Sequence, residues 1–236
     1  MNTDMLWYLE NIDVLNLLCP HKVGDPKRMA RHTQARVVKG GCIYMPRDRA
    51  EMIFIIMSGQ VKISSINAEG KEITKMILGK GEVFGEMAVI GEMLRHDYAI
   101  ALADTELCIV DIHELCSLMR ERSELNAFFM RIFGSRQLDM ERRFESLIFQ
   151  DSRSRIVALL LELVSTQGER VGIEWVIRRP ITHQEIANIT ATSRQTVTTT
   201  LNDLRYKRLI SFSRSRLLIR DTEALHREMI SPDRMS

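Results

Sequence analysis

Residues 181–204 read ITHQEIANITATSRQTVTTTLNDL, a pattern that predicts two short helices joined by a tight turn. Thr182 followed three residues later by Glu185 is the signature of a capping box, in which each residue satisfies a free N–H group of the other at a helix start. After the polar turn 190–192, Ser193 can cap a second helix. The apolar residues expected to face inward are Ile186, Ile189, Val197, Leu201 and Leu204. The stretch is therefore predicted to be a helix-turn-helix.

The second of these helices carries side chains that can read base edges. Its outward residues are expected to be Arg194, Gln195, Thr198, Thr199 and Asn202. Arginine can bond a guanine through two hydrogen bonds, glutamine can bond an adenine, and threonine can touch a thymine methyl group. Polar groups at helix N-termini also bind phosphate oxygens. The predicted DNA contacts on the two helices are Thr182, Gln184, Ser193, Arg194, Gln195, Thr196 and Thr199.

The residues that follow predict a two-stranded wing. Residues 206–210 lead into a segment, 211–219, whose tip offers Arg214 and Arg216 to the DNA backbone. Either arginine alone would be read as part of a solvated turn, but their position beside a helix-turn-helix favours a DNA surface. The net charge is only +2 and the pI about 8.4, so such a surface depends on local clustering of cations.

Upstream, residues 36–111 consist of short apolar runs separated by glycine. The runs are 36–38, 52–57, 60–66, 73–78, 82–84, 99–103 and 107–112. Short strands with frequent turn signals predict a β-sandwich or jelly roll. A short helix is expected over 112–120, and another over 6–18 near the N-terminus.

A long helix is predicted over 123–150, with Gly134 as the only breaker. One face repeats at alternating spacings of three and four residues: Met130, Phe133, Gln137, Met140, Phe144 and Leu147. This seam is typical of a parallel coiled-coil dimer, with Gln137 as a polar position that fixes the register. The alternative is an amphipathic helix lying on its own domain. A paired DNA site favours the homodimer, because two recognition helices give more specific affinity than one.

The predicted fold is α+β, with a β jelly-roll sensor domain at 1–122, a dimerisation helix at 123–150 and a winged helix-turn-helix at 151–236. In the last domain, Ser154 is expected to cap a helix that ends toward Gly168, and 171–177 to form one strand. The four cysteines lack metal-ligand spacing and are expected to be reduced thiols. With no signal peptide or membrane-length apolar run, a cytoplasmic protein is expected.

The whole chain resembles the cyclic-AMP receptor protein and FNR family of bacterial transcription regulators. The pattern I-T-x-x-E-I-A, then S-R-x-T-V-x-x-x-L, then L-I, lies in residues 181–210, and residues 77–86 resemble the glycine-rich turn before the family's effector pocket. The resemblance implies a homodimer on a two-fold symmetric promoter site, acting with RNA polymerase. It also implies a small signal that shifts the DNA-binding domains through the long helix.

The resemblance places an effector pocket around Gly85, Glu86, Arg95, Tyr98, Met140 and Glu141. Cyclic-nucleotide-binding members carry an Arg-Ser or Arg-Thr pair about ten residues after the Gly-Glu turn, whereas this chain has Asp97-Tyr98 there. An acidic residue repels a phosphate; only a shifted loop would bring Arg95 into that role. Met140-Glu141 also stands where cyclic-AMP binders have Thr-Ser. These departures disfavour cyclic AMP.

Other signals find little support. An iron–sulfur cluster of the FNR type needs several cysteines near the N-terminus, where Cys19 stands alone. Haem stays open, because four histidines could be axial ligands and no spacing selects one: His21, His32, His96 and His113. A redox response through cysteine pairs also stays open, as does a regulator with no small-molecule signal.

The competing hypothesis is a cupin-like metal-dependent enzyme with an appended interaction domain. Such a jelly roll needs a His-x-His pair with a further acid and histidine, but residues 36–111 contain only His96. The sequence also lacks a Ser-His-Asp, Cys-His or paired-carboxylate pattern. It therefore predicts a regulator rather than an enzyme.

Overall fold

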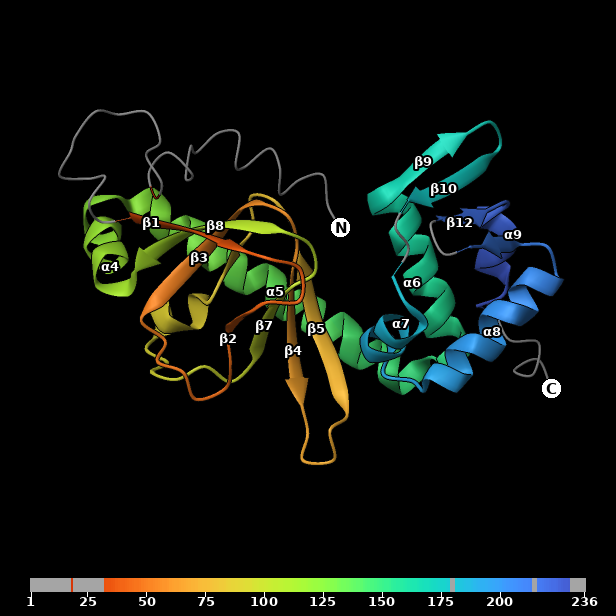
Figure 1. Cartoon of the computed structure of the whole chain (residues 1–236), viewed down its shortest axis with the longest axis horizontal. Helices are drawn as coiled ribbons and strands as arrows, with labels where there is room; N and C mark the ends of the chain where they lie inside the picture. Colours follow the sequence, from red (N-terminus) through yellow and green to blue (C-terminus); the bar gives the residue numbers. More distant parts are fainter. Residues whose placement is uncertain (1–17, 19–31, 179–180, 214–215, 230–236) are drawn as a thin grey trace. The chain divides into compact units, whose positions relative to one another are not determined.

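The computed structural model describes Leu18 and residues 32–178, 181–213 and 216–229. Contacts between residues divide the chain into two units, the first ending at Gln137 and the second beginning at Leu138. The helix predicted over 6–18 lies outside the described residues apart from Leu18. Each unit is described by itself (Figure 1).

The first unit contains two four-stranded antiparallel sheets (Figure 1). One has the order β1-β8-β3-β6, with β1 at His32–Val37, β3 at Met52–Ser58, β6 at Val83–Phe84 and β8 at Thr105–Asp111. The other has the order β2-β7-β4-β5, with β2 at Cys42–Tyr44, β4 at Val61–Ile66, β5 at Glu72–Leu78 and β7 at Tyr98–Ala101. The predicted β-sandwich is confirmed.

The strand β3 explains how the sandwich is filled. Its alternate residues Phe54 and Ile56 pack against β4, β5 and β7 between the sheets, whereas Ile53 and Ile55 pack on the opposite face. Burial on both faces accounts for the apolar residues 53–56, because neither side of this part of the strand meets water, whereas Met52 at its start is exposed. The strand β2 was not predicted, because it is short and has no buried residue.

Two helices cover the second face of the β3 sheet. Asp111 caps α4 (Ile112–Glu121), and α5 runs without interruption over Ser123–Phe149. The first half of α5 is anchored by four buried side chains, which pack in the same cluster as Ile53 and Ile55: Leu125, Phe128, Phe129 and Ile132. This part of α5 is therefore fixed to the β-sandwich.

The second unit packs three helices against a small sheet of order β11-β12-β10-β9 (Figure 1). The helices α6 (Ser152–Gln167), α7 (His183–Thr190) and α8 (Arg194–Tyr206) bury one apolar core, and α9 spans Thr222–Arg227. The strands are β9 (Gly168–Val171), β10 (Glu174–Arg178), β11 (Ile210–Phe212) and β12 (Arg216–Ile219). This is a winged helix-turn-helix, as predicted.

Three local expectations are wrong. Asp151, not Ser154, caps α6; its carboxylate accepts the N–H of Ser154, whose side chain is buried instead. The expected strand 171–177 is a hairpin, because Gly172 takes a left-handed φ of 63° and turns the chain between β9 and β10.

The third concerns the cysteines. Cys42 and Cys116 are free, but Cys108, which is fully buried on β8, is disulfide-bonded. Cys19 lies outside the described residues. Spacing along the chain gives no information on which sulfur atoms meet in space. Separately, none of the described helices is long and apolar enough to cross a membrane.

Candidate DNA-binding surface and sensor cavity

The helix-turn-helix is held by the predicted caps. Thr182 Oγ1 accepts the N–H of Glu185 at 3.2 Å, and Glu185 Oε2 accepts the N–H of Thr182 at 2.7 Å. Ser193 Oγ accepts the N–H of Thr196 at 3.0 Å and starts α8. Between the helices, Ala191 has a left-handed φ of 51°. The caps fix where both helices begin and so set the angle of the turn.

The buried and exposed faces of α8 divide largely as expected. Val197, Leu201 and Leu204 are buried, whereas Arg194, Gln195, Thr199 and Asn202 are exposed. Thr198 differs from the prediction, because its side chain is half-buried between helices. The exposed residues form a polar face on one side of α8.

The other predicted contacts on the two helices are partly engaged within the protein. The Ser193 hydroxyl lies 2.8 Å from that of Thr196, and Gln184 donates its amide to Asn188 at 2.9 Å. Hydroxyls and amides retain further donor and acceptor capacity when so bonded. In the wing, Arg216 at the start of β12 is exposed, whereas Arg214 lies outside the described residues.

A set of ion pairs anchors α8 to the rest of its unit. Arg153 on α6 pairs with Asp203 of α8 at 2.6 Å and with Glu228, and Glu228 also accepts from Lys207 at 2.9 Å. The two cations lower the pKa of Glu228 against the opposing effect of burial. Arg155 also donates to the Thr190 carbonyl at 3.0 Å, next to the turn of the motif. These contacts hold the polar face of α8 in one orientation.

The predicted seam on α5 is largely exposed. The exposed fractions are 71% for Met130, 62% for Met140, 64% for Phe144 and 50% for Leu147. Gln137 is also exposed, but Phe133 packs partly against the sandwich core. Large apolar side chains that repeat along a helix and meet water mark an interaction surface.

The first unit contains a small cavity of about 50 Å³ beside the turn at Gly85. Of the predicted pocket residues, Gly85, Glu86 and Arg95 line it, together with Tyr44 and Asp97. Tyr98, Met140 and Glu141 are not among its lining residues. Tyr98 is half-buried on β7, whereas Met140 and Glu141 are exposed on α5.

Arg95 is turned into the protein. Its guanidinium donates to the carbonyls of Gly85, at 2.9 Å, and Met52, and lies 4.6 Å from the ring centre of Tyr44. Only 6% of the residue is exposed, and burial lowers the pKa of its guanidinium. A Cβ atom at position 85 would lie 2.9 Å from Arg95 Nη1, so this close approach requires glycine.

Glu86 is also occupied by an internal partner. Its side chain is 7% exposed and pairs with Arg136 of α5, which in turn donates to the Val83 carbonyl at 2.6 Å. Burial lowers the pKa of Arg136 to about 10, so the guanidinium stays charged at neutral pH. The pair joins the turn after β6 directly to the first half of α5, a contact that the sequence did not reveal.

The cavity is small for a cyclic nucleotide. Pockets for such ligands usually enclose several hundred Å³, against about 50 Å³ here. Asp97 is held by Lys75 at 2.5 Å and Ser65 at 2.9 Å, so a carboxylate occupies the expected phosphate position. No cluster of three or more metal-binding side chains occurs within the described ranges.

Comparisons with known proteins agree with this division of the chain. Residues 34–122 match the cyclic nucleotide-binding domain family, and residues 154–228 match the Crp-like helix-turn-helix domain family. A CooA mutant from Carboxydothermus hydrogenoformans superposes with a TM-score of 0.74 at 23% identity, covering 92% of this chain and 94% of that one. The structural likeness shows a shared fold.

The chain is also similar in sequence to curated transcription regulators. The global nitrogen regulator of Nostoc sp. is 31% identical over 188 residues, which cover 79% of this chain and 84% of that protein. A CRP-like cAMP-activated global transcriptional regulator of Mycobacterium tuberculosis is 27% identical, with 80% and 84% covered. With the winged helix-turn-helix and the β-sandwich, this similarity shows that the chain belongs to the CRP/FNR family of bacterial transcription regulators.

Proposed function

We propose that this regulator works in the cytoplasm as a homodimer that binds two half-sites on promoter DNA and acts with RNA polymerase. The observation that carries the proposal is the polar face of α8, held by two caps and by the ion pairs of Arg153. The exposed seam on α5 supports dimer formation, because a second copy of α5 would cover it. A bound dimer can affect transcription by recruiting or blocking the polymerase.

The proposed domains correspond to three separate roles. We assign residues 1–122 to sensing, 123–150 to dimerisation and 151–236 to DNA binding. The connector between α5 and α6 is short, since α5 ends at Phe149 and α6 begins at Ser152. A change in the sensor domain would reach the recognition helices through α5 and this connector.

Base reading is assigned to Arg194, Gln195 and Thr199, with Arg194 selecting a guanine in each half-site. The duplex for the test is selected from a random pool with the wild-type protein. Arg194→Ala should weaken binding to this duplex by about 1–3 kcal/mol per half-site, and to random DNA by much less. Fluorescence anisotropy on both duplexes measures the difference.

Arg216→Ala is the control for this experiment. We assign Arg216 to the phosphate backbone, so its removal should weaken binding to both duplexes by a similar factor and lower the salt dependence. If Arg194→Ala also weakens both duplexes equally, Arg194 contacts only phosphate and the base-reading assignment is wrong.

The sensor domain is proposed to respond to a signal other than cyclic AMP. The support is chemical: Asp97 stands at the expected phosphate position, and Arg95 and Glu86 are engaged inside the protein. Addition of millimolar cyclic AMP should leave the affinity for the selected duplex unchanged within about twofold. A tenfold increase in affinity would show that the cavity opens to the nucleotide.

A further inference from the structure

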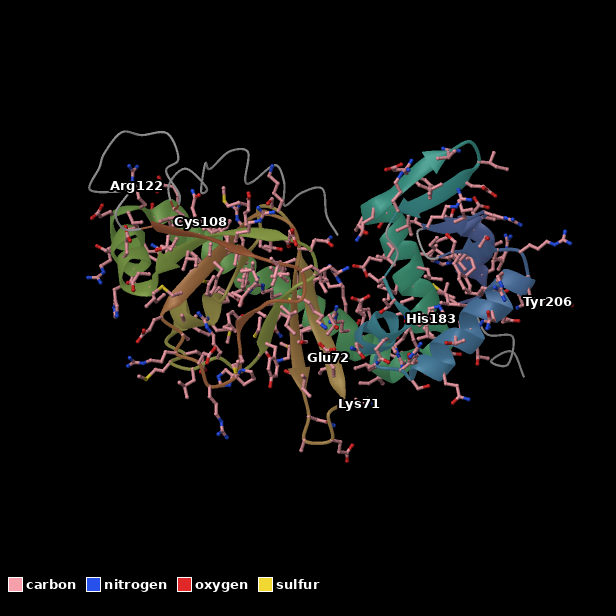
Figure 2. The ribbon with its side chains drawn as sticks, viewed as in Figure 1. Lys71, Glu72, Cys108, Arg122, His183 and Tyr206 are labelled. Carbon is pink, nitrogen blue, oxygen red and sulfur yellow. The ribbon has the colours of Figure 1, made fainter. Side chains whose placement is uncertain are left out.

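A contact between the two DNA-facing helices and the wing involves His183, the first residue of α7 (Figure 2). Its Nδ1 lies 3.0 Å from Thr198 Oγ1 on α8, and its ring meets Phe212 of β11 edge-on, with 5.8 Å between ring centres. Arg205 of α8 lies 5.1 Å from the same Phe212 ring. Thr198 and Arg205 are seven residues apart and so share one face of α8.

Two hydrogen bonds of Thr198 bear on which ring nitrogen of His183 carries the proton. The Thr198 hydroxyl has one hydrogen, and it donates this hydrogen to the Arg194 carbonyl at 2.9 Å. With its hydrogen assigned to the Arg194 carbonyl, Thr198 Oγ1 accepts from His183, and this assignment places the proton of a neutral ring on Nδ1. In a neutral imidazole the other nitrogen, Nε2, is then an acceptor without hydrogen.

This assignment restricts what His183 can offer to DNA. A phosphate oxygen accepts hydrogen bonds and does not donate them, so a neutral ring in this tautomer cannot bind one through Nε2. A protonated ring can, because both nitrogens then donate. The side chain is half-buried, which leaves part of the ring accessible, and no bond to Nε2 occurs within the described part of the chain.

The elements that surround the ring of His183 carry several charged residues. The charged residues on these elements are Glu185 on α7, Arg194, Asp203 and Arg205 on α8, and Arg216 on β12. Glu185 is occupied by its capping bond and Asp203 by Arg153. A bound DNA backbone adds the negative charge of its phosphates at this surface.

We propose that His183 is a proton-linked contact to the DNA backbone, which takes up a proton when the protein binds and so tightens binding as the pH falls. The proposal rests on DNA binding by this domain, and it adds a dependence on pH that the helix-turn-helix alone does not supply. Histidine changes charge in the range from about pH 8 to about pH 5.

The test uses the full-length protein, the selected duplex and a salt titration at about pH 8 and about pH 6. Wild-type affinity should increase on the order of tenfold at the lower pH, because each half-site gains a charge-assisted bond. The slope of log affinity against log salt should steepen by about 0.9 for each His183 that binds a phosphate. His226→Asn, at an exposed histidine of α9, should leave both changes intact.

Two variants separate this role from a structural one. His183→Asn places an amide donor near the position of Nδ1, so it should keep the affinity at pH 8 and lose most of the gain at pH 6. Thr198→Val removes the hydroxyl that accepts the Nδ1 proton. The neutral ring can then carry its proton on Nε2 and donate it to a phosphate. The affinities for the selected duplex at pH 8 and pH 6 should therefore become more similar.

The result that overturns the proposal is a His183→Asn protein that shows the wild-type gain and the wild-type steepening of the salt slope. A wild-type protein whose affinity does not change with pH overturns it equally. Failure of the wild-type protein to select any duplex from the random pool would instead contradict the proposed function. The two failures are therefore distinguishable.

Discussion

Phe144→Glu is expected to convert the protein to a monomer and to lower its affinity for the selected duplex by at least about 100-fold. Phe144 is 64% exposed on α5 and belongs to the repeating seam. In a parallel dimer its equivalent on the second copy would face it, so the substitution places two carboxylates together in an apolar interface. Sedimentation velocity measures the mass, and anisotropy the affinity.

The matched control is Leu138→Glu. Leu138 is 53% exposed on the same helix but lies one residue away from Gln137 and hence outside the repeat of the seam. The same chemical change there should leave the dimer intact. A Phe144→Glu protein that sediments as a dimer and binds DNA normally would show that copies associate through another surface.

Glu86→Gln is expected to destabilise the β-sandwich by about 3–5 kcal/mol, because it removes the carboxylate that pairs with the buried guanidinium of Arg136 and leaves Glu82 as the remaining acidic group that acts on it. The side chains of the pair are 7% and 18% exposed, so water screens them little. A loss of this size lowers the midpoint of thermal unfolding by roughly 10–18 °C for a unit of this length. Calorimetry of the full chain measures the shift.

Two comparisons make the result specific. Glu86→Leu combined with Arg136→Met removes both charges and should restore most of the stability, whereas Arg142→Gln breaks an exposed pair with Asp139 and should cost less than about 1 kcal/mol. In a Trp7→Phe background, Trp175 fluorescence reports only the second unit, whose unfolding should not change. A midpoint within about 1 °C of wild type for Glu86→Gln would mean that the pair contributes nothing.

The sequence predicted best the features that depend on neighbouring residues. The capping box of Thr182 and Glu185 and the buried stripe of α8 are both present, because cap spacing and helical period are local properties. The continuous apolar run of β3 likewise indicated a strand. At the start of α6, local signals competed: Asp151 and Ser154 are both good caps, and the helix begins at the earlier residue.

Features that depend on residues far apart in the chain were not predictable in this way. The Glu86–Arg136 pair joins positions 50 residues apart, and nothing in the sequence around either indicates the other. His183 was passed over for the same reason, since Thr198 and Phe212 reach it only after the helices and wing pack. The sequence suggested that Arg95 could replace the missing phosphate ligand, but its guanidinium binds two carbonyls instead.

Because α5 is continuous, the number of residues in it sets how far its second half is rotated about the helix axis relative to its first half. No break separates the half that packs on the β-sandwich from the half that follows Gln137. One inserted residue turns everything beyond it by about 100° and advances it by about 1.5 Å, whereas seven residues complete nearly two turns. The length of α5 can therefore change only in near-whole turns if the residues of the seam are to stay on one face of the helix.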